Sequence, residues 1–280
     1  MLRIVIILLS LTLIACQTVK PKTIVTSPSP SASPEVSESP TPDMADNTAE
    51  DTVRLKKTTL KNKQGQKWEL EAETVDWADA KSKALAQEVD WWLLGEDDEP
   101  WVKVVSPHAD IDMKNQIVIF TGETIATRVG FPEEMKVQRL VYRGNEKTFH
   151  GSGGVTWRRD PSIPVSKTKT DQPEVSQIPI KVESPEVEYN TITENVVFSG
   201  ETIASRIGSK ERLKVRKLIY KSEDRKFYGS GGVSWQRPAA ELTGETLTAS
   251  ADLDRIQLKG RVKGKIKGGS KNFQDSQKAN

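Results

Sequence analysis

Gly122-Glu123-Thr124-Ile125-Ala126 recurs at a constant offset of 78 as Gly200-Glu201-Thr202-Ile203-Ala204, and Gly151-Ser152-Gly153-Gly154-Val155 recurs as Gly229-Ser230-Gly231-Gly232-Val233. The whole of 102–157 aligns with 180–235 at this offset without a gap, and 25 of the 56 paired positions are identical. Repetition at a fixed spacing is typical of stacked supersecondary units that share one core. Any function common to both copies therefore lies in the repeated framework.

A shorter period lies inside the long one. An apolar-charged-apolar triplet starts at five positions, which follow one another at intervals of 34, 33, 45 and 33: Trp68, Val102, Met135, Ile180 and Leu213. The long interval contains 160–179, whose Pro, Ser, Thr and Lys content is typical of an inserted surface loop. A sixth unit is expected to begin near Leu247. The long offset therefore spans two units and one insertion.

Each unit alternates apolar and polar residues, turns, and alternates again. In the unit that begins at Val102, the alternation continues through Ile111, turns at Lys114-Asn115 and returns through 117–120. Period-two alternation with short polar turns is typical of antiparallel strands. The sequence thus predicts an all-β fold, in which about six strand-turn-strand units form a long curved sheet or a folded-over jelly roll around a common interior.

The first residues are typical of an exported protein. Arg3 precedes an apolar run that is too short to cross a bilayer, which needs about 20 residues, so 1–15 is predicted to be a signal peptide. Leu13-Ile14-Ala15-Cys16 is similar to the lipobox of bacterial lipoproteins, which predicts lipidation of Cys16 and attachment to a membrane. The alternatives are an ordinary cleaved signal or an uncleaved anchor, each with an incidental cysteine.

The segment after Cys16 is predicted to be a tether. Residues 16–51 are rich in Ser, Pro and Thr and carry too little apolar surface to fold. The folded part is expected at 52–268, followed by a flexible tail at 269–280. Because 41 basic and 39 acidic residues nearly cancel, nucleic acid is not an expected partner.

The sequence offers no catalytic or metal-binding constellation. The only two histidines, His108 and His150, have Glu186 and Tyr228 at their repeat positions, and the only cysteine is Cys16. Neither histidine has a second one nearby in sequence to complete a metal site. We therefore expect a protein without catalytic residues, cofactor or metal.

Two repeated motifs are similar to parts of active sites but are expected to be structural. Glu123 and Glu201 occupy equivalent turns, whereas a general acid and base need different environments, so a cap on a backbone group of the turn is expected. The glycine clusters at 151–154 and 229–232 lack the lysine and the following helix of a phosphate loop. They are expected to form bulges or bends within strands.

Tryptophan gathers in the first unit and at its exit. Five lie within a short span, more than a small core layer needs: Trp68, Trp77, Trp91, Trp92 and Trp101. They indicate an apolar groove for a lipid or a hydrophobic docking edge. For Trp157 and Trp235, simple core packing is the favoured interpretation.

Basic residues alternate with small or apolar ones near the end of the chain. The basic positions are Lys259, Arg261, Lys263, Lys265 and Lys267. In an extended strand this pattern places the positive charges on one face. They either protect an edge strand from unwanted pairing or attract anionic headgroups and lipid phosphates.

Taken together, these features resemble the LptC family, the anchored periplasmic component of lipopolysaccharide export, and above all its long cyanobacterial members. The resemblance spans about 52–267 and rests on recurring Ser-Pro and Gly-x-Val elements and on the opening strand, with Gly65, Trp68, Leu70, Ala72 and Val75-Asp76-Trp77. It implies an elongated antiparallel β-jelly roll of the OstA, LptA and LptC type, open along one side, with acyl chains inside. The lipobox and the greater length depart from proteobacterial members.

The resemblance also implies a conduit for lipid. Lipopolysaccharide would pass from the inner-membrane Lpt ABC transporter subunits to an LptA-like bridge protein by β-strand augmentation, with the chain periplasmic and lipid-anchored at the inner membrane. The interior that binds lipid is expected to include Trp68, Leu70, Ala72, Trp91, Leu93, Val102, Val104, Ile117, Ile119, Val137, Val155 and Trp157. Headgroup or edge contacts are expected at Lys259, Arg261, Lys263 and Lys265.

A structural β-solenoid scaffold lipoprotein without a ligand is the alternative. Its core should be filled by side chains, whereas a lipid carrier should have an apolar trough open to lipid. A solenoid enzyme acting on polysaccharide would need an exposed carboxylate cluster on one face, and the sequence supplies no asymmetric set of that kind.

Overall fold

The computed structural model describes residues 53–61, 67–78, 82–163 and 178–266, which belong to one compact unit, 49–280. Every regular element within these residues is a strand: β1 (Val53–Lys61), β2 (Lys67–Ala78), β3 (Lys83–Leu94), β4 (Pro100–Asp112), β5 (Ile117–Arg128), β6 (Glu133–Arg143), β7 (Thr148–Arg159), β8 (Ile180–Asn190), β9 (Val196–Arg206), β10 (Arg212–Lys221), β11 (Lys226–Gln236), β12 (Ala240–Ser250), β13 (Ile256–Lys259) and β14 (Lys263–Ile266). The signal peptide, Cys16, the tether, the tail and most of the 160–179 loop lie outside the described residues.

The strands form a single antiparallel sheet. From β1 to β13 each strand pairs with the next one along the chain, and β14 pairs with β12 beside β13. The sheet is open, because β1 and β13 end its order without pairing with each other. The prediction of an all-β antiparallel fold is confirmed.

Most strands are interrupted near the middle by an irregularity of pairing. Between β4 and β5 the register shifts between Val105 and His108, and comparable shifts recur in the pairs that follow, up to β11 with β12. Gly200 in β9 has a φ of +92°, and a Cβ there would lie 2.7 Å from the Pro185 side chain, so only glycine fits without strain. The glycine clusters lie at these shifts, which confirms that they form bulges or bends.

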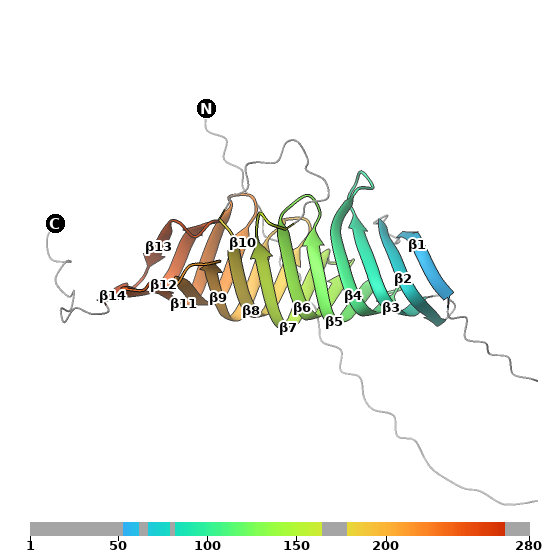
Figure 1. The fold of residues 1–280 in the computed structure, drawn as a ribbon, viewed down its shortest axis with the longest axis horizontal. Coiled ribbons are helices and arrows are strands. Elements are labelled where there is room, and N and C mark those ends of the chain that lie inside the picture. The colour runs from blue at the N-terminus through green and yellow to red at the C-terminus, as the bar shows by residue number, and fades with distance from the viewer. Residues whose placement is uncertain (1–52, 62–66, 79–81, 164–177, 267–280) are drawn as a thin grey trace, which may run out of the picture. The chain divides into compact units, whose positions relative to one another are not determined.

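The irregularities form a corner along which the sheet folds into two layers that share one core (Figure 1). The ring of Trp91 in β3 lies 6.0 Å from that of Phe149 in β7. In a flat sheet, four strand spacings would separate them by about 19 Å. Each long strand therefore contributes one half to each layer.

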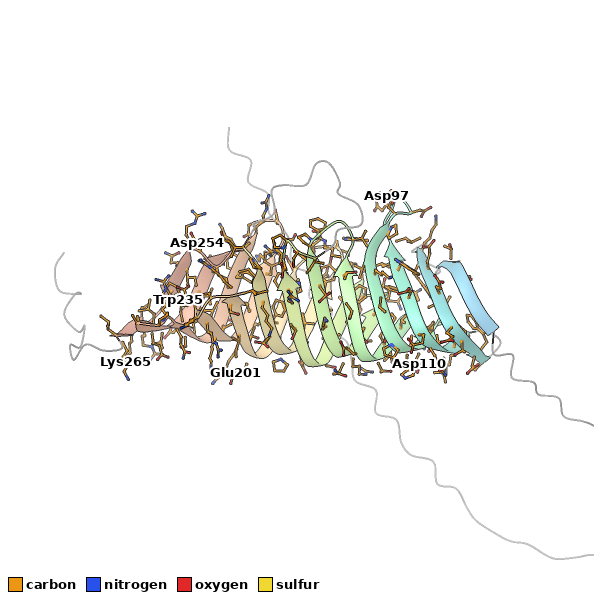
Figure 2. All side chains as sticks on the ribbon, in the orientation of Figure 1. Asp97, Asp110, Glu201, Trp235, Asp254 and Lys265 are labelled. Carbon is orange, nitrogen blue, oxygen red and sulfur yellow. The ribbon has the colours of Figure 1, made fainter. Side chains whose placement is uncertain are left out.

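The turns at the two ends of the strands form two rims. The first rim consists of 95–99, 129–132, 207–211 and 237–239, and the second of 113–116, 144–147, 191–195, 222–225 and 251–255. Figure 2 shows Asp97 from the first rim and Asp254 from the second on the same side of the sheet, with Glu201 at the corner on the opposite side. The folded sheet thus has a corner on one side and two facing rims on the other.

The long repeat corresponds to four strands. Trp157 in β7 pairs with Val182, and Trp235 in β11 pairs with Leu242. Trp91 in β3 has the same position, but its offset to Trp157 is shorter, because no insertion lies between them. The offset from Trp157 to Trp235 includes the interval of 45 in place of 33. Trp91 is therefore a third copy of the position, which a constant offset of 78 does not reveal.

Two expectations about the C-terminal part are wrong. The sixth unit begins at Ala240, where β12 starts, and not near Leu247, because the turn at 237–239 is short. The basic alternation does not form one strand, because Gly260 and Arg261 have φ values of +73° and +34° and separate β13 from β14.

Candidate functional site

The interior between the two layers is where the sequence predicts lipid binding. The structure buries ten of the twelve residues predicted there: Trp68, Leu70, Ala72, Trp91, Leu93, Val102, Val104, Val137, Val155 and Trp157. Ile117 and Ile119 are only half-buried, and their predicted interior position is wrong. Val118 and Phe120 are buried instead. Side chains of a strand alternate between its faces, and an unbroken run of four apolar residues does not tell which pair faces inward.

Aromatic rings fill much of this interior. Two clusters each surround one tryptophan, with ring centroids 5.2 to 6.4 Å apart: Trp91 with Phe120, Tyr142 and Phe149, and Trp157 with Phe198, Tyr220 and Phe227. Each tryptophan comes from the half of its strand near the first rim, and its partners come from the opposite layer, two to four strands further on. The clusters therefore join the two layers.

A small cavity remains in the interior. Its volume is about 60 Å³, and its apolar wall consists of Val102, Ala126, Met135, Phe149, Trp157 and Val196. Pockets that enclose a ligand usually start at about 300 Å³. The cavity is therefore too small to hold an acyl chain in this conformation.

Charged side chains lie at one side of the cavity. Arg128 and Glu133 line it beside Tyr189. The Arg128 Nη2 donates to the carboxylate of Glu194, and the Arg128 Nη1 lies 3.9 Å from that of Glu133. Arg128 ends β5 at the first rim, whereas Glu194 lies in the β8–β9 turn of the second rim. This ion pair therefore joins the rims across the mouth of the folded sheet.

Arg159 is the most deeply buried charge of this group, with 5% of its side chain exposed. Its Nε lies 3.3 Å from the Glu133 carboxylate but without hydrogen-bond geometry, and its Nη2 has no hydrogen-bond partner. Its guanidinium lies over the ring of Tyr220 at 4.7 Å. Burial raises the pKa of the Tyr189 and Tyr220 hydroxyls. The Tyr189 hydroxyl also has no hydrogen-bond partner. The group thus contains buried donors that no acceptor satisfies.

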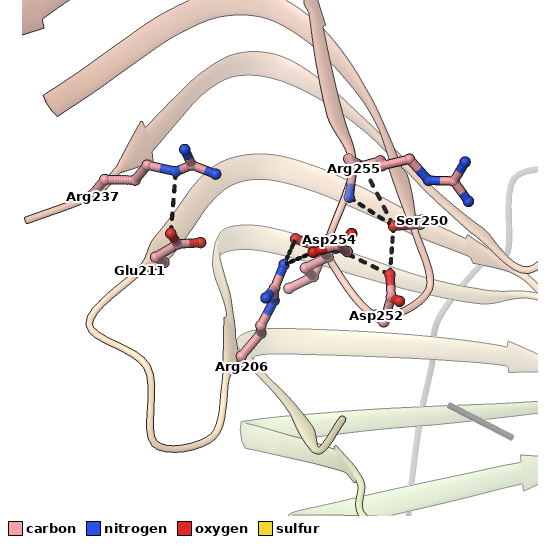
Figure 3. A network of polar contacts seen from close by, with 8 residues as sticks. Arg206, Glu211, Arg237, Ser250, Asp252, Asp254 and Arg255 are labelled. Carbon is pink, nitrogen blue, oxygen red and sulfur yellow. Dashed lines mark hydrogen bonds and ion pairs between the residues drawn. The ribbon is translucent and has the colours of Figure 1, made fainter. Parts of the chain in front are cut away.

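A second polar group recurs four strands further along the sheet (Figure 3). Arg206 is the repeat counterpart of Arg128 and ends β9 at the first rim. It donates to the Leu253 carbonyl at 2.8 Å and to the Asp254 carboxylate at 3.0 Å, both in the β12–β13 turn of the second rim. The connection between the rims is therefore part of the repeat.

The sequence prediction did not include these rim residues. Their signal was the identity of charged residues in both copies: Arg128 with Arg206, Glu133 with Glu211, and Arg159 with Arg237. The Nε of Arg237 lies 3.2 Å from the Glu211 carboxylate, as that of Arg159 lies near Glu133. Both members of these oppositely charged pairs recur in the second copy, as expected of side chains in contact.

The corner is held by buried hydroxyls next to the repeated glutamates. Ser106 Oγ lies 3.0 Å from the Thr124 hydroxyl and within hydrogen-bond distance of two backbone carbonyl oxygens. Ser184 makes the same set of contacts with Thr202 and two backbone carbonyls. Glu201 is exposed at the corner (Figure 2). The structural role expected of the glutamates thus belongs to their neighbours.

The basic residues near the C-terminus are exposed at an edge of the sheet. They are Lys259 in β13, Lys263 and Lys265 in β14, and Arg261 between them. Arg261 Nε donates to the Glu245 carboxylate at 2.6 Å. This position fits both protection of the edge and contact with anionic headgroups.

No group of three His, Cys, Asp or Glu side chains in the described part of the chain could hold a metal ion. His150 instead lies 3.1 Å from Glu188 on the exposed face, through its Nε2. Among the same residues, no helix is long and apolar enough to span a membrane.

The fold defines a class of protein: a folded, open antiparallel sheet with an apolar interior. Residues 163–267, which contain the second copy of the repeat, match the family described as "Lipopolysaccharide-assembly, LptC-related", the family that the sequence predicted. The description of that family places it in lipopolysaccharide assembly.

Among solved structures, the chain is similar to LptH from Pseudomonas aeruginosa, described as the LptA-homologous periplasmic component of the conserved lipopolysaccharide transport device. The identity is 14% over 43% of this chain and 75% of LptH, with a TM-score of 0.34. A search of curated proteins finds no significant match.

Proposed function

We propose that this chain is a non-enzymatic component of lipopolysaccharide export that holds acyl chains between the two layers of its folded sheet. The match of residues 163–267 to an LptC-related family supports the pathway. The first copy of the repeat, at 102–157, shares 25 of 56 positions with the second, which supports the same role for it.

The observation that carries the proposal is how the rims are connected. Turns on the same rim are linked by backbone hydrogen bonds, such as Gly144 N to Gln116 O and Thr191 N to Lys147 O. Within 82–163 and 178–266, no backbone hydrogen bond joins one rim to the other. In the same residues, the side-chain hydrogen bonds across the mouth are those of Arg128 and Arg206, and the Arg159 guanidinium also contacts the Tyr220 ring. Separating the layers on that side therefore breaks side-chain contacts and leaves the sheet ladder intact.

An acyl chain would replace contacts of the same kind as those that the layers make with each other. The cavity wall is apolar, and its volume of about 60 Å³ offers a starting point for enlargement. Burial of apolar area contributes about 25 cal/mol per Å², whether the partner is a side chain or a lipid. The closed interior would thus be the state without lipid.

We further propose a lipid anchor at Cys16 and a periplasmic position at the inner membrane. The sugars of the lipid would stay in water at the mouth. Donor and acceptor would be the inner-membrane Lpt ABC transporter subunits and an LptA-like bridge protein, joined to an open sheet edge by β-strand augmentation. The edge formed by β13 and β14 suits such pairing, since both strands pair only with β12.

The filled interior also supports the second candidate, a scaffold lipoprotein without a ligand. Photo-crosslinking in living cells separates the two. The probe is placed at Val104, which is fully buried, and at the adjacent Val105, which is 42% exposed and serves as a matched control. A second pair is Phe120 and Ile119.

A carrier predicts lipopolysaccharide adducts at Val104 and Phe120 and few at Val105 and Ile119. No adduct at either buried position, in a normally expressed protein, would favour the scaffold. The anchor is tested separately, because Cys16→Ser should move the protein from the membrane fraction to the soluble one. An unchanged distribution would count against lipidation.

A further inference from the structure

We propose that Arg128 is an anion-binding residue: it takes the phosphate group of an amphiphile whose acyl chain enters the cavity beside it. The inference rests on the proposed function and adds a site for the polar end of the ligand. In the closed state, Glu194 occupies this site and holds the rims together. Ligand phosphate and Glu194 therefore compete for the same guanidinium.

The position of Arg128 joins the two chemistries that a phosphate-bearing amphiphile needs. Its side chain lines the cavity whose wall includes Met135 and Trp157, and 12% of it is exposed. A phosphate bound there would lie at the surface with its chain directed inward. The Phe131 ring, 3.6 Å from the guanidinium carbon, keeps the arginine plane in place.

Some hydrogen-bond donors around Arg128 have no acceptor. The Nε of Arg128 has no hydrogen-bond partner, and neither has the Nη2 of the buried Arg159. Glu133 lies between the two guanidinium groups, 3.9 Å from one and 3.3 Å from the other. A phosphate offers several strong acceptors and matches the fork of a guanidinium, so it would satisfy donors that the closed state leaves unpaired.

Glu194 is the partner that can leave. Its side chain is 32% exposed, more than twice the value of Glu133, and it lies on a turn with a φ of +54°. Ser222 on the same rim donates to the same carboxylate and could keep it after it leaves Arg128. With Glu194 displaced, two arginines face the single carboxylate of Glu133, and the local charge becomes positive.

The test uses the full chain purified in dodecyl maltoside micelles, an uncharged amphiphile with the same chain as the probe. Dodecyl phosphate is added, and ³¹P NMR line broadening reports binding of its headgroup. Inorganic phosphate is titrated in a second series, which separates a lipid headgroup from free phosphate. The variants are Arg128→Gln and Glu194→Gln, with Arg216→Gln as a control for charge, because Arg216 is exposed at the corner.

The two halves of the ion pair should have opposite effects. Arg128→Gln should weaken dodecyl phosphate binding about tenfold, the value of a lost charged hydrogen bond. Glu194→Gln should strengthen it about threefold, because an exposed competing charge is removed. Arg216→Gln should stay within about twofold of the natural chain.

Several results would overturn the proposal. Changes in the same direction in both variants would mean that the pair is only structural, and equal broadening of inorganic phosphate would exclude a chain-bearing ligand. Absence of broadening with the natural chain would also exclude the site. If Arg128→Gln fails to fold, Arg128→Lys keeps the charge, loses the fork and should weaken binding less.

The outcome is separable from that of the lipid-carrier proposal. Crosslinks to lipopolysaccharide at Val104 that persist unchanged in Arg128→Gln cells, together with unchanged ³¹P titrations, would retain the carrier and remove the anion site. Phosphate binding without any crosslink at Val104 would retain the site and remove the carrier.

Discussion

The two copies of the repeat share three charged residues near the first rim, Arg128/Arg206, Glu133/Glu211 and Arg159/Arg237, and the copies place the last of them in different environments. Arg159 in the first copy is 5% exposed, and its counterpart Arg237 is 44% exposed. The difference in exposure comes from the next copy, because its Tyr220 ring packs over the Arg159 guanidinium at 4.7 Å. In the described residues, no third copy follows to cover Arg237. A unit of this sheet is thus completed by the unit four strands further on.

The tryptophans of the two copies differ in the same way. Trp157 lies against three aromatic rings of the following copy. Trp235 is buried, but within 178–266 its ring contact is with the guanidinium of Arg237, at 3.7 Å. The C-terminal copy therefore has the same inward residues and fewer partners, which makes it the weaker end of the core.

The largest expected effect on stability tests the comparison between Trp157 and Trp235. Trp157→Ala should lower the free energy of unfolding by about 3–5 kcal/mol, because it removes a buried ring from a packed aromatic cluster. Trp235→Ala should lower it by no more than about half as much. Urea titrations followed by far-ultraviolet circular dichroism measure both.

A control for the first prediction is Trp101→Ala, since Trp101 is only partly buried against the core. It should have the smallest effect of the three. Equal losses at Trp157 and Trp235 would mean that the following copy does not supply the packing, and the comparison of the two ends would be wrong.

The second largest effect on stability is expected at the buried Arg159. Arg159→Met should destabilise the protein by about 3 kcal/mol, because it leaves Glu133, whose side chain is only 13% exposed, with Arg128 alone, 3.9 Å away. Arg237→Met should cost at most about 1 kcal/mol, since that pair is exposed. Thermal melting of both variants in the same buffer tests the difference. A smaller loss for Arg159→Met than for Arg237→Met would contradict it.

Much of the fold could be predicted from the sequence because a strand has a period of two and the units follow one another at nearly constant intervals. Val102 and Val104 lie on either side of the polar Lys103, and Val155 precedes Thr156, so alternation predicts their inward positions. Ile117 and Ile119 could not be assigned, since their neighbours Val118 and Phe120 are also apolar. There, only contact with the opposite layer decides the face.

The candidate site was harder to predict than the fold. Arg128 and Glu194 are far apart in the sequence and belong to different units, so the ion pair exists only after the sheet folds at its corner. Nothing local marks either residue. The repetition of Arg128 as Arg206 was visible, but the partners Glu194 and Asp254 do not share the offset of the repeat.

The corner offers a comparison in which both copies should agree. Ser106→Ala and Ser184→Ala each remove a buried donor from the same set of contacts. Each should cost about 2 kcal/mol, within about 0.5 kcal/mol of the other. A double-mutant cycle of Ser106→Ala with Thr124→Val should give a coupling energy above about 0.5 kcal/mol. Clearly unequal losses, or no coupling, would show that the corner is not an equivalent joint in both copies.

The smallest expected effects distinguish the two connections between the rims. The Asp254 side chain is 61% exposed, against 32% for Glu194. Asp254→Asn should cost less than about 0.5 kcal/mol, and Glu194→Gln about 1 kcal/mol. Differential scanning calorimetry at low salt and in 1 M NaCl measures both.

Salt makes this last comparison decisive, because the screening length falls to about 3 Å at 1 M and exposed charges lose most of their attraction. The effect of Asp254→Asn should vanish in 1 M NaCl, whereas that of Glu194→Gln should persist in part, since Arg128 is 12% exposed and Arg206 is 24% exposed. Arg216→Gln at the corner should leave the stability unchanged both at low salt and in 1 M NaCl. If both rim variants lose their effect equally in salt, the two connections are equivalent, and the mouth of the folded sheet is equally easy to open along both copies.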